Sequence, residues 1–301
     1  MDRYEQFRRA AAERDIPADE IDKFADQLRF AVWASTSEEG EDVVGQDGGL
    51  PRLPADIAWP GSEIENPLPF IASVDCAALP RAEGLPLPVD GSLLFFLNHE
   101  DDFDASCTPG TAGAAQVLYV PAGTETVAAP PPPGHDTVFS HDPNISFLTP
   151  EYPLSAWVAP ELPEWLEERD VQFEPDSVKQ LFDELKHVDE LCELVDELWP
   201  PREGVTFRFG GYCEEIGGSD SPWTVMAKAN LRDRLEANPD LPRSERFRLR
   251  DAEEDRLIRE WVPLVQFYTQ SDVHYGCFLI SRDDLAAKRF DRMRSFTMFS
   301  E

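Results

Sequence analysis

Prolines and glycines interrupt the segment from Gly48 to about Val158 so often that no long helix fits within it. Short apolar runs lie between the interruptions, and runs of this length are typical of strands. The clearest are Leu68–Val74, Ser92–Leu97 and Gln116–Val120. Pro130–Pro133 lacks backbone donors and predicts an extended surface loop. The sequence therefore predicts a sheet built from short strands.

Helical patterns flank this segment. Residues 1–34 predict a pair of helices, the second with apolar residues three and four apart: Ile21, Phe24, Ala25, Leu28, Ala31 and Val32. Asp176 to Trp199 has the same spacing and predicts the strongest helix, which Pro200 and Pro201 end. His187 lies off the apolar face of that helix and is expected to be exposed beside a carboxylate. Ser244–Glu260 predicts a further, highly charged helix.

A second strand pair, Trp261–Tyr268 and Cys277–Ile280, resembles the first pair. A diglycine precedes each pair, Gly48-Gly49 in one case and Gly210-Gly211 in the other. This repetition predicts an α+β fold with mixed or antiparallel sheets in two similar halves, flanked by helices and the N-terminal helical pair. We expect one domain over residues 44–301, with half one at about 44–158, a helical segment at about 161–200 and half two at about 204–301.

The net charge of −32 repels nucleic-acid phosphates and anionic membrane surfaces. It is consistent either with a solvated acidic surface that maintains solubility or with an acidic face for a basic protein partner. The first residues are charged, and no apolar run approaches the roughly 20 residues that span a bilayer. We therefore expect a cytoplasmic protein; the charge leaves the oligomeric state open.

The sequence lacks the common catalytic motifs. It has no GxSxG elbow, no GxxxxGK[ST] loop and no GxGxxG after a strand, so we expect no nucleotide cofactor. Its five cysteines are scattered without a CxxC pair, which favours free thiols in a reducing compartment.

One acidic run could bind a metal ion. It follows a predicted strand and supplies His99, Asp101 and Asp104. Hard cations favour oxygen-rich clusters, but the spacing does not match an EF-hand. A local acidic run is also expected by chance in a chain with 59 acidic residues.

Several motifs together resemble the YwqG-like (DUF1963) family of uncharacterised bacterial proteins. They are Gly48–Pro54, Trp59-Pro60, Pro67–Asp75, Gly210-Gly211-Tyr212, and Leu264–Phe267 with Asp272 and Gly276. The resemblance covers roughly residues 44–295. It departs from the family pattern at Ser73, where the family usually has glutamine, and at Tyr212-Cys213-Glu214, which replaces a proline-containing loop.

Relatives of this family resemble components of toxin–immunity neighbourhoods. The resemblance therefore implies a non-enzymatic module that binds a protein, such as an immunity protein that neutralises a basic toxin. The alternative is an enzyme or metal-dependent small-molecule binder that uses a cleft between the halves. Its candidate residues are Asp75, Gln266, Asp272 and Trp59. A purely structural interpretation is also open, in which the aspartates cap turns and Trp59 packs against the proline-rich entry.

Overall fold

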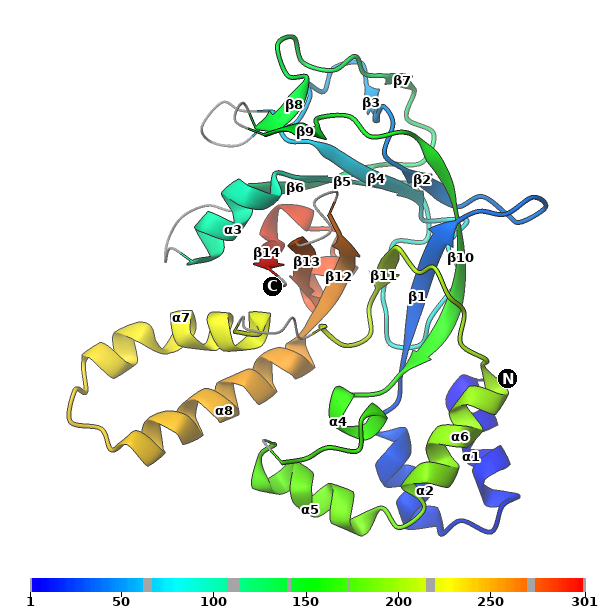
Figure 1. Cartoon of the computed structure of the whole chain (residues 1–301), viewed down its shortest axis with the longest axis vertical. Helices are drawn as coiled ribbons and strands as arrows, with labels where there is room; N and C mark the ends of the chain where they lie inside the picture. Colours follow the sequence, from blue (N-terminus) through cyan, green and yellow to red (C-terminus); the bar gives the residue numbers. More distant parts are fainter. Residues whose placement is uncertain are drawn as a thin grey trace.

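The computed structural model describes residues 2–61, 67–107, 114–139, 142–172, 174–214, 220–269 and 274–299. Its main element is one ten-stranded sheet in which every neighbouring pair is antiparallel (Figure 1). In spatial order the strands are β14 (Arg294–Phe299), β13 (His274–Ser281), β12 (Trp261–Tyr268), β11 (Phe207–Phe209), β1 (Arg29–Thr36), β10 (Tyr152–Glu161), β2 (Gly45–Asp47), β4 (Phe70–Asp75), β5 (Ser92–Leu97) and β6 (Ala115–Val120).

Two short strand pairs and several helices complete the described fold. The pairs are β3 (Arg52–Pro54) with β7 (Thr126–Ala128) and β8 (Thr137–Phe139) with β9 (Asp142–Ser146). The helices are α1 (Arg3–Ala12), α2 (Ala18–Ala25), α3 (His99–Cys107), α4 (Glu164–Glu167), α5 (Asp176–Glu184), α6 (Val188–Leu198), α7 (Pro222–Glu236), α8 (Arg243–Glu260) and α9 (Arg282–Ala286), with a 3₁₀ turn at Phe290–Arg292. The predicted α+β class is confirmed.

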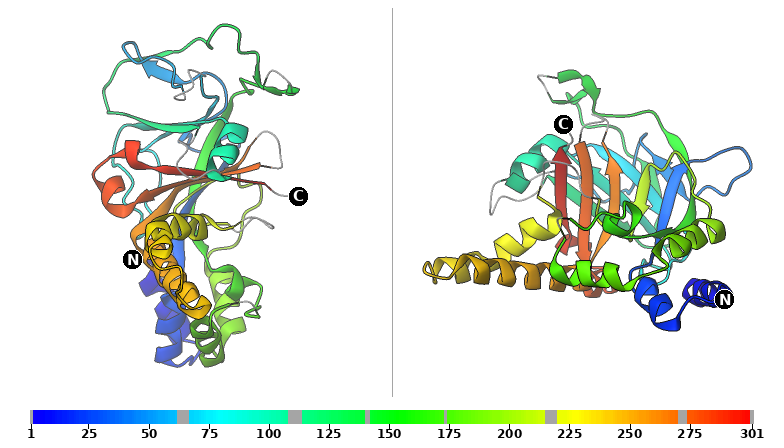
Figure 2. Two further views of the ribbon diagram at one scale, coloured as in Figure 1. Left: turned by 90° about the vertical axis from the view of Figure 1, so that its left-hand side faces the viewer. Right: turned by 60° about the horizontal axis from the view of Figure 1, so that its bottom comes forward.

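The sheet bends so that its two ends share one apolar interior (Figure 2). The ring of Phe95 on β5 lies 6.2 Å from that of Phe278 on β13 and 6.0 Å from that of Phe209 on β11. All three side chains are buried. Burial of each phenylalanine side chain contributes about 1.5–3 kcal/mol to the stability of the fold. A flat sheet would expose these rings, so their burial stabilises the bent form.

Two groups of helices lie beside the sheet, while α3 packs on β14 and α9 on β13. Helices α1, α2 and α6 pack together at one end of the sheet, and α1 and α2 meet through stacked Phe7 and Phe24 rings 5.4 Å apart. Helices α7 and α8 form an arm that extends away from the sheet (Figures 1 and 2). Its base is held by a second apolar cluster in which Trp223 and Leu257 pack against the β13 and β14 side chains.

Most strands predicted from short apolar runs are confirmed, but the N-terminal prediction is wrong in extent. Helix α2 ends at Ala25, and residues 29–36 form β1 in the middle of the sheet. Phe30, Ala31, Val32 and Ala34 are all buried, so both faces of this segment are covered. A continuous apolar run of this kind matches a buried strand as well as a helical stripe. Residues 29–34 therefore belong to the sheet, not to an N-terminal helical unit.

The predicted helix over 176–199 is also wrong, because the chain breaks it into α5 and α6. Leu185 has an extended conformation and is buried. Glu20 on α2 accepts hydrogen bonds from the backbone N–H groups of Lys186 (2.8 Å) and His187 (3.0 Å). The carboxylate of Glu20 therefore holds the backbone of the two residues that lie directly before α6. The His187 ring also contacts Glu20, its Nδ1 lying 3.0 Å from Oε2.

Candidate functional site

Asp75 stabilises a turn at the end of β4. Its carboxylate accepts a hydrogen bond from the Ala77 N–H (2.9 Å), and its backbone carbonyl accepts from Ala78 and Leu79 (3.1 Å each). The side chain is exposed. Its described contacts are therefore local, as expected for a residue that caps backbone amides.

Gln266 lies in the middle of β12 and is almost completely buried. Its Oε1 accepts from the Glu214 N–H (3.0 Å), and its Nε2 donates to the Tyr212 carbonyl (2.8 Å). These bonds clamp the backbone that follows the second diglycine. Gln46 on β2 acts similarly after the first diglycine, since its Nε2 donates to the carbonyls of Gly48 (2.9 Å) and Leu50 (3.1 Å).

The structure does not bring Asp75 and Gln266 together. Strands β11, β1, β10 and β2 lie between β12 and β4, and the two residues share no described partner. Asp272 lies outside the described residues, so its place in a shared cleft stays a prediction. Trp59 is half-buried; its Nε1 donates to the Leu68 carbonyl (2.9 Å) and its ring packs 6.1 Å from that of Phe96. Its described contacts are those of a packing residue.

The candidate metal residues lie at the start of α3. His99 is buried, and its ring lies 4.8 Å from that of His274. Burial, together with His274, lowers the pKa of His99 to about 4. Asp104 is exposed, and Asp101 is half-buried. Within the described part of the chain, no group of three or more His, Cys, Asp or Glu side chains is arranged to hold a metal ion.

A buried polar cluster that the sequence did not reveal surrounds the second diglycine. Glu161, the last residue of β10, is buried and accepts hydrogen bonds from Trp33 Nε1 (2.6 Å) and the Tyr212 N–H (2.7 Å). Burial raises the pKa of Glu161, against the opposing attraction of Arg208. Arg208 itself pairs with Glu214. Ionisable groups held in this way often mark functional sites.

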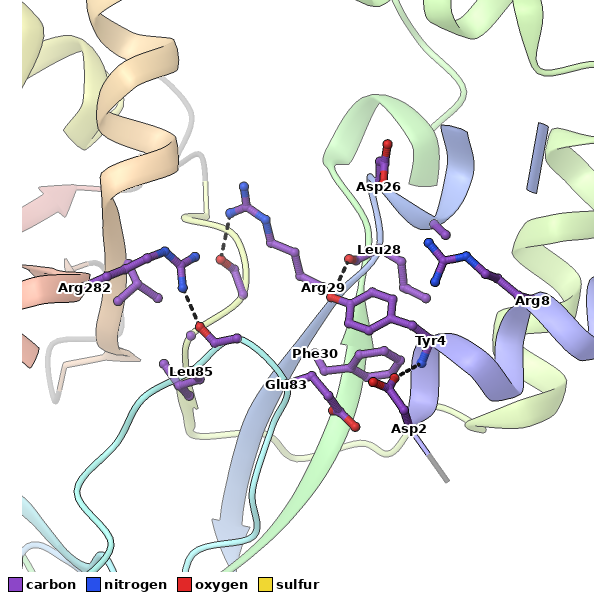
Figure 3. Close-up of a pocket in the computed structure, with 15 residues that line it drawn as sticks. Asp2, Tyr4, Arg8, Asp26, Leu28, Arg29, Phe30, Glu83, Leu85 and Arg282 are labelled. Atoms are coloured by element: carbon purple, nitrogen blue, oxygen red, sulfur yellow. Dashed lines mark hydrogen bonds between the residues drawn. The ribbon is translucent and has the colours of Figure 1, made fainter. Parts of the chain in front are cut away.

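Beside this cluster lies a cavity of about 440 Å³, which we call the diglycine pocket (Figure 3). Its walls come from six separate parts of the chain. The residues used below are Leu28, Arg29, Phe30, Leu85, Gly210, Gly211, Val262 and Arg282. Leu85 belongs to the connection between β4 and β5, and Arg282 begins α9. The cavity is within the usual size range of ligand sites.

The lining of this pocket carries three arginines and three carboxylates: Arg8, Arg29 and Arg282 with Asp2, Asp26 and Glu83. Arg29 donates to the Gly211 carbonyl (3.2 Å) and stacks over the Tyr212 ring at 4.0 Å. Arg282 donates to the Gly84 carbonyl, and its Nε to the Arg259 carbonyl (3.3 Å). Among the described residues, neither guanidinium has a carboxylate within ion-pair distance. Burial and the Arg29 guanidinium lower the pKa of Arg282. In Figure 3 the side chains of Arg29 and Arg282 extend toward each other from opposite sides of the pocket.

Glycine is required where the backbone forms the wall of the pocket. Gly210 and Gly211 have φ of +80° and +73°, which other residues rarely adopt. A Cβ on Gly210 would lie 3.0 Å from the Leu85 side chain, and one on Gly211 would overlap the Glu161 carboxylate. The diglycine therefore lets the backbone, Glu161 and Leu85 pack closely around the cavity.

The fold and pocket define an α+β protein in which loops from distant parts of one antiparallel sheet enclose a small cavity. The chain belongs to the DUF1963 family, a domain of unknown function, whose family model matches residues 46–297. The family resemblance of the motifs is thereby confirmed. Arg29 lies before the matched range, and Gly210, Gly211 and Arg282 lie within it.

A comparison with curated proteins gives no match. None of the helices in the described ranges is sufficiently long and apolar to cross a bilayer.

Proposed function

We propose that this protein is a non-enzymatic binding protein whose ligand is a small organic anion held in the diglycine pocket. One observation carries the proposal: Arg29 and Arg282 face the same cavity, and among the described residues neither has a carboxylate partner. A guanidinium has five N–H donors and recognises carboxylates and phosphates well. Most of these donors remain available to a ligand.

Two arginines without a carboxylate partner are unusual in a chain as acidic as this one. The protein has 59 acidic and only 27 basic residues, so carboxylates are abundant. At the rim of the same pocket, Arg8 pairs with Asp22 (3.1 Å), and Glu83 pairs with Arg3 (2.8 Å). Two half-buried arginines without such partners repel each other, and a bound anion would relieve that repulsion.

The other walls favour an organic molecule over a bare inorganic ion. Leu28, Phe30, Leu85 and Val262 line the pocket with apolar surface. A carboxylate- or phosphate-bearing compound could place its charged group at the arginines and its carbon skeleton against these side chains. The family motif contributes the glycines that shape the wall, which supports a role for the motif in binding.

The arrangement of the sheet also supports the proposal that two halves arose by internal duplication. Strand β2 leads into Gly48-Gly49, and β11 leads into Gly210-Gly211. Each of these short strands pairs with a longer strand that carries a bulge: β2 with β4, and β11 with β12. The Gly48 N–H donates to the Ile71 carbonyl (2.7 Å), and the Gly210 N–H to the Pro263 carbonyl (2.8 Å). On this proposal the pocket lies between the halves, since Leu85 comes from the first and Arg282 from the second. Superposition of β2, β4 and β5 on β11, β12 and β13 should align the two diglycines; a mismatch of one residue or more would contradict the duplication.

The experiment is a calorimetric and thermal-shift screen of carboxylates and phosphomonoesters against the full chain. Loss of a charge-assisted hydrogen bond costs about 1.5–3 kcal/mol, so Arg29→Gln or Arg282→Gln should each weaken a hit by about tenfold or more. Arg248→Gln is the matched control, because Arg248 is exposed on the α7–α8 arm outside the pocket. Hits that bind both pocket variants as tightly as the unaltered chain would refute the site.

A second candidate function, binding a basic protein partner, rests on the net charge of −32. We place this protein in the cytoplasm, a setting supported by Cys76, Cys192, Cys213 and Cys277 being free thiols. Affinity purification at moderate salt should recover one stoichiometric basic protein. Recovery of only a salt-sensitive mixture would count against this candidate and leave the anion pocket untouched.

A further inference from the structure

A second cavity, of about 300 Å³, lies where α4 and α6 cover β1 and β10 (Figure 1). We call it the tryptophan groove, and define it by Trp33, Trp157, Trp199, Val195, Glu167 and Asp196. No residue of this groove lines the diglycine pocket. The two cavities can therefore be tested separately.

Three indole rings give the groove its chemistry. Trp33 on β1 and Trp157 on β10 are direct partners across the two antiparallel strands, so their side chains project from the same face. Trp33 is held by its hydrogen bond to Glu161 (2.6 Å), and Trp199 by an edge-to-face contact with Phe30 at 5.1 Å. All three tryptophans are half-buried, which leaves part of their surface accessible.

Charge at the rim favours a cation. Glu167 and Asp196 are exposed there, and among the described residues neither forms an ion pair within 4 Å. Arg169 also lines the groove, but its guanidinium is paired with Asp189 (2.9 Å). The negative potential of the whole molecule adds to this local preference.

The chain itself shows how a cation fits. Arg202, which follows Pro200 and Pro201, places its guanidinium 4.9 Å from the centre of the Trp157 ring. Cations bind indole faces more strongly than other aromatic rings. Arg202 is exposed, so this contact can be displaced by a better-placed group.

We infer that the tryptophan groove binds the guanidinium of an arginine side chain presented by a basic protein partner. The indoles of Trp33, Trp157 and Trp199 supply the stacking surface, and Glu167 and Asp196 attract the cation. Arg202 is an internal competitor for the Trp157 face. The inference does not depend on the diglycine pocket. It gives the proposed basic partner a defined anchor point.

The test is a titration of the full chain with N-acetylarginine amide, followed by tryptophan fluorescence and calorimetry. N-acetylcitrulline amide is the matched neutral probe, since it keeps the shape and removes the charge. We expect saturable binding of the arginine probe and at least about fivefold weaker binding of the citrulline probe. Arg202→Gln should strengthen arginine binding severalfold, and Asp196→Asn should weaken it; both replaced residues are exposed, so both variants should fold.

A short peptide with a single arginine distinguishes a protein source from a free metabolite. Binding of the peptide at least as tight as that of the amide supports the inference. Binding of the amide alone would overturn the protein partner, and equal binding of arginine and citrulline probes would overturn the charge-based recognition. No change in Arg202→Gln would show that Trp157 is not part of the site. None of these outcomes affects the anion-binding proposal, because the Arg29 and Arg282 variants test that separately.

Discussion

Replacing Gly211 with alanine should destabilise the protein far more than an ordinary glycine substitution. Gly211 has φ of +73°, and an alanine in this conformation costs about 1–2 kcal/mol. Its Cβ would also overlap the Glu161 carboxylate, which is buried and must then move. Moving it breaks the hydrogen bonds from Trp33 Nε1 and the Tyr212 N–H. Each lost buried partner costs about 1–3 kcal/mol. The expected total is therefore about 3–8 kcal/mol.

The matched control is Gly204→Ala. Gly204 also has positive φ, +76°, but a Cβ there would meet nothing within 4 Å. This variant should lose only the conformational cost of about 1–2 kcal/mol. Urea unfolding of both variants at neutral pH, followed by circular dichroism, measures the difference in unfolding free energy.

A double-mutant cycle isolates the contact between Gly211 and Glu161. In a Glu161→Ala background there is no carboxylate to displace, so Gly211→Ala should cost no more than Gly204→Ala. Equal costs for Gly211→Ala and Gly204→Ala in the unaltered chain would refute the packing argument. So would an undiminished cost in the Glu161→Ala background.

Three further changes test other parts of the structure. Burial raises the pKa of Asp47 to about 6, above the unfolded value of about 4, so the free energy of unfolding falls as the pH rises through this range. Asp47→Asn should therefore raise the free energy of unfolding by about 1–3 kcal/mol at pH 7.5 and have little effect at pH 3.5. Urea unfolding at both pH values measures the difference. Glu20→Ala removes the carboxylate that accepts from the Lys186 and His187 amides between α5 and α6. The variant should lose about 1–3 kcal/mol of unfolding free energy, and a loss below about 0.3 kcal/mol would contradict this role. The Sγ atoms of Cys213 and Cys277 are 3.8 Å apart, so this pair should form a disulfide on oxidation with diamide. Burial raises the pKa of the Cys213 thiol, so the reaction should be slow and should become faster as the pH is raised. Peptide mapping identifies the crosslink, and a different pairing would contradict the position of the loop after the second diglycine.

The sequence predicted β4, β5 and β12 well because their signals are local. Strands β4, β5 and β12 are short apolar runs bounded by turn residues, and the structure places each within two residues of the prediction. Strand β1 was missed because both of its faces are covered, which removes the alternation that distinguishes a strand from a helix. The break before α6 could not be predicted locally, because its stabilising carboxylate, Glu20, is 166 residues away from Lys186 in the sequence.

The same reasoning explains which site residues could be found. Gly210, Gly211 and Gln266 stand out because they recur in a motif, and they shape or clamp the wall of the pocket. Arg29 and Arg282 carry no local signal. These two arginines are candidates for ligand binding because no described carboxylate forms an ion pair with them. Only the folded structure shows which charged side chains are neighbours.

Glu161 is the residue through which the two cavities are physically connected. One carboxylate oxygen accepts from Trp33, whose ring lines the tryptophan groove. The other accepts from the Tyr212 N–H, next to the Gly211 that forms the wall of the diglycine pocket. Because Glu161 is buried and accepts from both Trp33 and the Tyr212 N–H, it cannot move without changing one hydrogen bond in the tryptophan groove and one beside the diglycine pocket. A ligand that moved Glu161 would change hydrogen bonds beside both cavities, and any resulting change in affinity would act equally in both directions.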